Sequence, residues 1–206
     1  MKHALLVGLL LVALPAGLAM AVETPPYKSV VRDGDYELRD YPALVVAEVT
    51  VEGEQKAAAN KGFRLLAGYI FGANRKRQDI AMTAPVAQQP VGGEKIAMTA
   101  PVAQAPAAAG TWVVRFTMPS QWTLQTLPVP DNPAVTLRNT QPARFAALRF
   151  SGLAKPNDVR ARSAELLAWA KARKLRVAGP VSLAQYNPPW TPWFMRRNEV
   201  MVEVAR

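Results

Sequence analysis

Aromatic and basic side chains gather in one segment near the end of the chain. Residues 186–197 read YNPPWTPWFMRR, so four aromatic rings and a methionine stand directly before Arg196 and Arg197. Prolines stiffen the segment, and loops are normally polar, so these rings must pack on something: a helix of the protein itself or a flat apolar ligand. We expect packing on the protein itself before a ligand. The guanidinium groups add the capacity to pair with carboxylates.

Several kinds of chemistry are excluded by composition. The chain has no cysteine and one histidine, His3. Thiol nucleophiles, disulfides and zinc–thiolate sites are therefore excluded. If His3 is removed with a leader, Ser-His-Asp catalysis and imidazole ligation of a metal are excluded as well. The carboxylates are scattered, with no pair at a spacing suited to acid–base catalysis, so we expect no catalytic residues, no resident metal and a protein that is not an enzyme.

The first 21 residues have the pattern of a secretory signal peptide. Lys2 precedes an apolar run from Ala4 to Leu14, Pro15 breaks the run, and Ala19-Met20-Ala21 has the small-x-small cleavage pattern. We expect cleavage after Ala21, a periplasmic or secreted location, and one domain at residues 22–206. An uncleaved membrane anchor is the alternative.

The basic excess is dispersed along the chain. Lys and Arg number 25 against 15 Asp and Glu, a formal net charge of +10, and the clusters at 75–77, 171–176 and 196–197 are small. Such charges are typical of solvated faces, and we expect no nucleic-acid partner. An anionic membrane surface and a small carboxylated ligand stay open as partners. A monomer is the default expectation.

Two similar halves are indicated by the pattern of elements. Alternation predicts strands at 28–32, 35–41 and 43–51, and apolar spacing predicts a helix from Glu54 to just before Gly72. In the second half, TLR before Pro-Ala parallels ELR before Pro-Ala one hundred residues earlier, followed by a strand at 144–150 and a helix from near Asn157. The chain therefore resembles two β-hairpin-plus-helix units.

A second repeat lies between the two helices. Residues 80–88 and 96–104 both read IAMTAPVAQ. Each copy alternates well enough to be a strand that ends at its proline, and Gly92-Gly93 between them suits a hairpin turn. A further strand is predicted at 112–118.

Five motifs in order resemble the SOUL haem-binding protein family, over almost the whole chain beyond the leader. They are YELRDY (36–41), LLAGYIFGAN (65–74), IAMTAPV (80–86 and 96–102), WVVRFTMPS (112–120) and YNPPWTPWFMRRNEVMVEV (186–204). The resemblance implies an α+β domain in which two β-α-β-β repeats form a distorted antiparallel barrel or sheet flanked by two helices. This agrees with the duplication inferred from the elements. The family carries one copy of the IAMTAPV strand in its animal members, and the sequence alone leaves open which copy takes that place.

The resemblance also implies a ligand, haem or free porphyrin, held in an apolar groove beside the first helix and roofed by the C-terminal loop. A tetrapyrrole is an apolar disc with two carboxylates at its edge, so it needs apolar faces and rim cations, for which Lys61, Arg64, Arg196 and Arg197 are the candidates. The residues expected to contact the ligand are Lys61, Phe63, Arg64, Leu66, Ala67, Ile70, Tyr186, Trp190, Trp193, Phe194, Met195, Arg196 and Arg197.

The absence of histidine beyond the leader limits how haem iron could be held. Tyr or Met would ligate it, or no protein atom would. A non-catalytic carrier or buffer of haem is therefore the expected function. The alternative is an interaction module whose aromatic loop binds a protein or a membrane surface.

Overall fold

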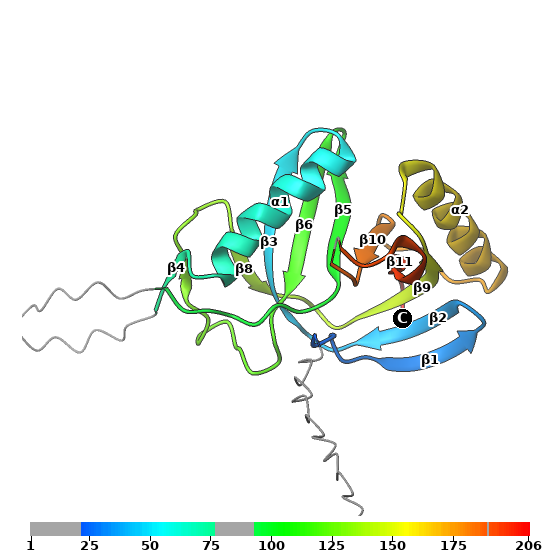
Figure 1. Ribbon diagram of the computed structural model, residues 1–206. Helices are drawn as coiled ribbons and strands as arrows, with labels where there is room; N and C mark the ends of the chain where they lie inside the picture. The colour runs from blue at the N-terminus through cyan, green and yellow to red at the C-terminus, as the bar shows by residue number, and fades with distance from the viewer. Residues whose placement is uncertain (1–21, 77–92, 189) are drawn as a thin grey trace, which may run out of the picture.

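A large curled antiparallel sheet organises the computed structural model, which describes residues 22–76, 93–188 and 190–206 (Figure 1). Its strand order is β1-β2-β9-β11-β10-β5-β6-β3-β8. In chain order these strands are β1 (Lys28–Asp33), β2 (Tyr36–Tyr41), β3 (Val45–Glu52), β5 (Val102–Ala108), β6 (Thr111–Thr117), β8 (Thr136–Asn139), β9 (Ala143–Ser151), β10 (Ser182–Gln185) and β11 (Arg197–Val204). The short strands β4 (Asn74–Arg75) and β7 (Val129–Pro130) pair separately.

Helices α1 (Gln55–Ile70) and α2 (Pro156–Ala172) cover one face of the sheet, which we call the helix face. α1 packs on β3 and β6, and α2 packs on β9 and β11. One row of directly paired residues runs beneath both helices, and paired residues share a face. The row is Val49, Val114, Gln104, Leu183, Val200 and Leu148. The expected α+β fold, an open barrel-like sheet flanked by two helices, is confirmed.

Each helix buries one apolar stripe against the sheet. On α1, Leu66, Tyr69 and Ile70 are at most 1% exposed and pack with the β3 and β6 side chains. On α2, Leu166 and Ala170 are fully buried, and Leu166 packs against β9 and β11. Burial of each large apolar side chain contributes about 1.5–3 kcal/mol, so these stripes fix both helices on the helix face.

The second IAMTAPVAQ copy differs from its prediction as a strand that ends at its proline. Ile96 is buried beside the end of α1, where its N–H donates to the Ile70 carbonyl at 2.8 Å. The chain then runs without regular strand pairing to Pro101, and β5 begins after the proline, at Val102. This order has a physical reason, because proline has no N–H to donate to a ladder. The first copy, at 80–88, lies outside the described residues, as does Gly92 of the predicted hairpin turn.

Gly93, three residues before the second copy, lets the chain pass close to the backbone of Gly72 just after α1. A Cβ placed on Gly93 would lie 1.7 Å from the carbonyl oxygen of Gly72, far inside van der Waals contact. Only glycine allows so close an approach between two backbones. Arg77 stands at the equivalent position before the first copy, and its side chain would clash there.

Close packing of α1 on β6 predicts opposite effects for two glycines of the same helix. An ideal Cβ on Gly62 would lie 2.5 Å from Val114 Cγ2, whereas one on Gly68 would meet nothing closer than 4.0 Å. We expect Gly62→Ala to destabilise the protein by about 1–3 kcal/mol through overpacking. The control Gly68→Ala should be neutral or stabilising by up to about 1 kcal/mol. Urea unfolding checks both values, and equal effects of the two substitutions would contradict this packing.

Candidate functional site

Three of the predicted binding residues lie on α1 at different angles around its axis, with Lys61 about 160° from Phe63 at about 100° per residue. Lys61, Phe63 and Arg64 are exposed, and the Phe63 ring packs edge-on against Phe116 of β6 at 5.5 Å between centroids. Ala67 is half-buried on the same helix.

Two predicted ligand contacts on α1 are core residues instead. Leu66 and Ile70 are 0% and 1% exposed and belong to the cluster beneath α1. The apolar spacing that defines the helix includes the stripe that buries it, so spacing alone does not separate a core face from a binding face.

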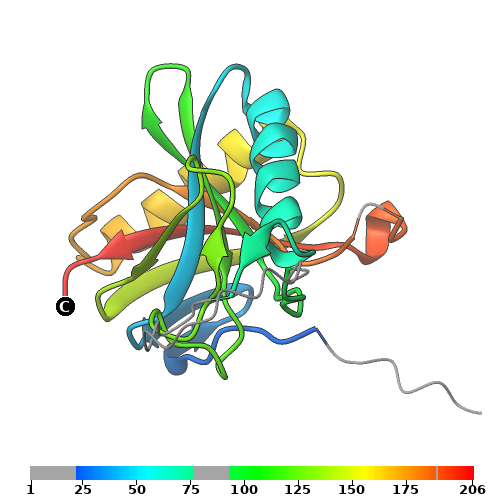
Figure 2. The ribbon, with the colours of Figure 1, turned by 90° about the vertical axis from the view of Figure 1, so that its left-hand side faces the viewer.

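The aromatic loop (residues 186–197) presents its large side chains to solvent. Trp190 is 82% exposed, and Trp193, Phe194 and Met195 are 60–63% exposed. Backbone hydrogen bonds and the short 3₁₀ helix η1 (Trp193–Met195) shape the loop, and Trp193 and Phe194 contact edge to face at 5.7 Å. Figure 2 shows η1 projecting from the body of the protein. The expectation that these rings pack on the protein itself is therefore wrong for Trp190, Trp193 and Phe194, while Tyr186 packs against the opposite face of the sheet.

A stretch of the helix face lies between α1 and the aromatic loop and has β5 and β10 as its floor (Figure 1). Phe116 beneath Phe63 belongs to a row of paired residues that crosses this floor and ends at Phe150 on β9. Four inter-strand spacings of about 4.8 Å, about 19 Å in all, separate Phe116 from Phe150.

The loop also borders α2, which the sequence did not predict. Trp193 and Phe150 line a hollow of about 400 Å³ together with Lys155, Asp158 and Arg162 of α2 and the turn before it. The predicted roof over the first helix is thus a loop set between the two helices.

The two loop arginines are already engaged. Arg196 Nε donates to the Thr191 carbonyl at 2.8 Å. Arg197 pairs with Glu199 at 2.7 Å and stacks over the Tyr186 ring at 4.0 Å. Arg197 is therefore paired with a carboxylate of the protein itself. Of the four cations predicted to meet the ligand's rim, Lys61 and Arg64 are the exposed ones.

Glu199 is the centre of a buried charged cluster on the opposite face of the sheet. Its fully buried carboxylate accepts hydrogen bonds from Arg39 at 2.6 and 3.1 Å, from Arg197, and from the Tyr186 hydroxyl at 2.7 Å. Burial alone would raise the pKa of Glu199, but the hydrogen bonds and charges of these partners hold it below its usual range. The cluster is internally satisfied, so we assign it a structural role.

The Tyr186 hydroxyl belongs to this cluster, because it donates a hydrogen bond to Glu199. Burial and the adjacent Glu199 carboxylate raise the pKa of the Tyr186 hydroxyl above its ordinary value. Burial likewise raises the pKa of Tyr41 to about 12. Neither phenol is suited to act as a tyrosinate ligand near neutral pH.

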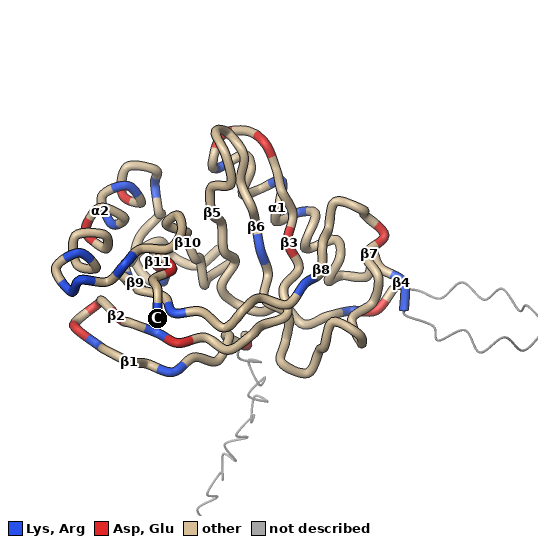
Figure 3. Tube along the Cα trace, turned by 180° about the vertical axis from the view of Figure 1, so that it is seen from behind, with Lys and Arg blue, Asp and Glu red and all other residues tan. Residues whose placement is uncertain are grey.

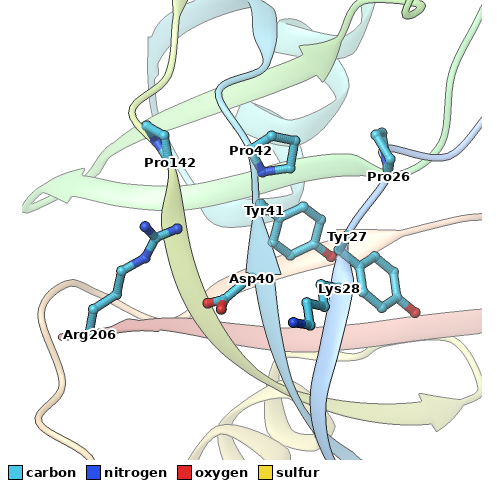
Figure 4. Close-up of a pocket in the computed structure, with 8 residues that line it drawn as sticks. All are labelled: Pro26, Tyr27, Lys28, Asp40, Tyr41, Pro42, Pro142 and Arg206. Atoms are coloured by element: carbon cyan, nitrogen blue, oxygen red, sulfur yellow. The ribbon is translucent and has the colours of Figure 1, made fainter.

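A second hollow, of about 370 Å³, lies at the other end of the sheet and contains none of the predicted binding residues. Figure 4 shows the Tyr27 and Tyr41 rings and three prolines around it, with Asp40 among basic side chains. Figure 3 shows Lys and Arg distributed over both helices and several strands rather than gathered on one element.

The comparisons with known proteins assign the family. The sequence profile of the SOUL heme-binding protein family matches residues 22–203, so the chain belongs to this family. Human heme-binding protein 2 is 41% identical over 73 residues, which are 33% of this chain and 36% of the human protein. The matched segment thus covers little more than a third of that relative's length.

Solved structures share the fold at low sequence identity. A hydrolase from Listeria innocua is 11% identical with a TM-score of 0.54, over 85% of this chain and 94% of that one. The C-terminal domain of EcmrR is 10% identical with a TM-score of 0.55, over 87% and 98%. At these identities the likeness concerns the fold alone.

Removing the central carboxylate tests the structural role of the cluster. Glu199→Gln removes one of the two carboxylate partners of the buried Arg39 guanidinium and the carboxylate partner of the partly exposed Arg197, so we expect a loss of about 2 kcal/mol or more in the free energy of unfolding at pH 7. The matched control is Glu165→Gln, which breaks an exposed pair with Arg162 and should change that free energy by less than about 1 kcal/mol. Equal losses in urea unfolding would contradict this assignment.

Acid should lower the free energy of unfolding by protonating Glu37, a carboxylate on the same face of the sheet as Glu199. Burial would raise the pKa of Glu37, but hydrogen bonds from Ser29, Arg39 and Arg32 outweigh it and lower the pKa to about 2 from 4.5. A lowered folded-state pKa stabilises the protein above pH 4.5, and this contribution is lost as the pH falls toward 2. In urea unfolding across this range, Glu37→Gln should flatten the pH dependence. An unchanged pH dependence would contradict the role of Glu37.

Proposed function

We propose that this protein reversibly binds haem or a related tetrapyrrole as a non-catalytic carrier or buffer. Membership of the SOUL heme-binding protein family across residues 22–203 is the observation that carries the proposal. The leader at residues 1–21 supports action in the periplasm or outside the cell after export.

The helix face between α1 and the aromatic loop is the proposed binding surface. Trp193, Phe194 and Trp190 offer exposed apolar area on one side, and Phe63 offers a ring edge on the other. Arg64, about 100° from Phe63 around α1, would meet a carboxylate at the rim of the disc, while Lys61, about 160° from Phe63, lies farther from this surface. Apolar burial with a few rim charges suits reversible holding, since most of the binding free energy then comes from contact with the porphyrin and not from the metal.

The residues present fit the porphyrin better than they fit its iron. Among the described residues no group of three or more acidic, His or Cys side chains is placed to hold a metal ion. The Tyr186 phenol is engaged by Glu199. Met195, 63% exposed in the loop, is the available thioether beside the proposed surface, and it would supply at most weak axial ligation of haem iron. We therefore expect metal-free porphyrin to bind nearly as well as haem.

Spectral titration tests the proposal with both ligands. We expect saturable Soret shifts with hemin and with metal-free protoporphyrin, and a loss of affinity of about five- to thirtyfold in Trp193→Ala or Phe63→Ala, since each removes ring contact worth about 1–2 kcal/mol. Leu167→Ala is the control, because Leu167 is 39% exposed on α2 and no predicted contact. No Soret shift with either ligand would refute tetrapyrrole binding.

The alternative is an interaction module that uses the same loop. Four large apolar side chains exposed on one projecting loop favour it, since tryptophan is well suited to the interface of a bilayer or a partner protein. Among the described residues no helix is long and apolar enough to cross a membrane. Salt-sensitive sedimentation with anionic liposomes, together with absent porphyrin binding, would favour this alternative.

A further inference from the structure

The aromatic loop exposes more apolar surface than one flat ligand can cover. Trp190 is 82% exposed, and Trp193, Phe194 and Met195 are 60–63% exposed. The rings of Trp193 and Phe194 stand at 88° to each other, so a disc that stacks on one ring meets the other only at its edge. Leu153, 49% exposed, lines the same hollow as Trp193 and extends the apolar area toward α2. Exposed apolar area of this kind, beyond what a tetrapyrrole would bury, indicates a further partner.

The composition and hydrogen bonds of the loop lower the free-energy cost of removing it from water. Residues 186–195 include no charged side chain. The N–H groups of Thr191 and Met195 donate to the carbonyls of Pro188 and Pro192, each at 3.0 Å, and the two prolines have no N–H of their own to dehydrate. Backbone polar groups are costly to bring into an apolar medium unless they are already paired. Pairing within the loop therefore favours a low-dielectric environment around its rings.

Charges act on the loop's partner at long range more than at close range. The hollow beside Trp193 is lined by two cations, Lys155 and Arg162, and by two carboxylates, Asp158 and Glu165, which balance one another. The whole chain has a formal net charge of +10, which attracts it toward an anionic surface. We expect the rings to supply most of the affinity and the net charge to increase it where the surface is anionic.

We propose that the aromatic loop docks the protein on a lipid bilayer by inserting its rings among the headgroups. Figure 2 shows η1 at the end of a projection from the body of the protein. A projection that exposes rings in several directions suits a fluid interface, which can surround it, whereas a protein partner would need a pocket that matches the loop. Docking requires no tetrapyrrole and excludes none, so it holds whether or not the function proposed above does.

Co-sedimentation with vesicles, in the absence of porphyrin, measures docking. Residues 22–206, which contain every described element, are used so that the apolar leader contributes nothing. We expect binding to phosphatidylcholine vesicles and severalfold tighter binding when about a third of the lipid is phosphatidylglycerol. Trp190→Ala should lower the partition coefficient by about fivefold or more on both vesicles. The matched control is Phe71→Ala, because Phe71 is 60% exposed but lies at the end of α1, and it should change the coefficient by less than about twofold.

Quenching by brominated phosphatidylcholine locates the inserted residues. Of the five tryptophans in the chain, we expect the vesicles to quench Trp190 and Trp193. The double variant Trp190→Phe, Trp193→Phe keeps aromatic rings in the loop, so it should still sediment with vesicles but lose the quenching. Failure to sediment, equal losses in Trp190→Ala and Phe71→Ala, or quenching that persists in the double variant would overturn the proposal. Self-association that Trp190→Ala abolishes, without vesicle binding, would assign the loop to a second copy of the chain and overturn it as well.

Discussion

The pairing of β10 with β5 is the contact on which the arrangement of this protein depends. It consists of three residue pairs, Leu183–Gln104, Ala184–Ala103 and Gln185–Val102. These pairs join the half of the sheet beneath α1 to the half beneath α2. A slip of one residue would turn every side chain of one half to the other face. The register therefore places both helices on one face, and it also brings the loop after β10 alongside the strand that borders α1.

The two faces of the sheet differ in the polarity of their side chains and therefore in the interactions that stabilise them. The helix face is apolar and buries its side chains beneath α1 and α2. The opposite face carries ion pairs, with Glu199 held by Arg39 and Arg197 and Glu48 held by Arg115 and Arg138. Burying such charges costs free energy that close hydrogen bonds offset. The strands that neither helix covers, β5 and β10, place Val102, Gln104, Leu183 and Gln185 on the helix face.

Much of the fold follows from local patterns in the sequence. Strands β1, β2, β3, β6 and β9 and both helices lie within a few residues of their predicted positions, because alternation and helical spacing report directly on which side chains are buried. β5 differs, since its motif alternates but the pairing begins after Pro101. Proline has no N–H for a strand ladder, so the pairing starts at Val102. The close approach of Gly93 to Gly72 joins residues distant in sequence, and no local pattern encodes it.

The candidate site was predicted less completely than the fold. Composition identified the aromatic loop, but the exposure of its rings depends on which surfaces the rest of the chain leaves free. Leu66 and Ile70 have the same spacing as a binding stripe, yet their side chains are buried on the face of α1 that packs against the sheet. The position of Glu199 directly after Arg196, Arg197 and Asn198 indicates an ion-pair partner, and the pair with Arg197 confirms it.

Mapping where metal-free protoporphyrin binds tests the central claim most directly. Backbone amide shifts of the ¹⁵N-labelled protein would report the surface without interference from iron. We predict saturable perturbations on the exposed flank of α1, on β5 and β10, and in the aromatic loop, with little change at the Glu199 cluster. Perturbations confined to the opposite face of the sheet, or the absence of any saturable change, would contradict the account.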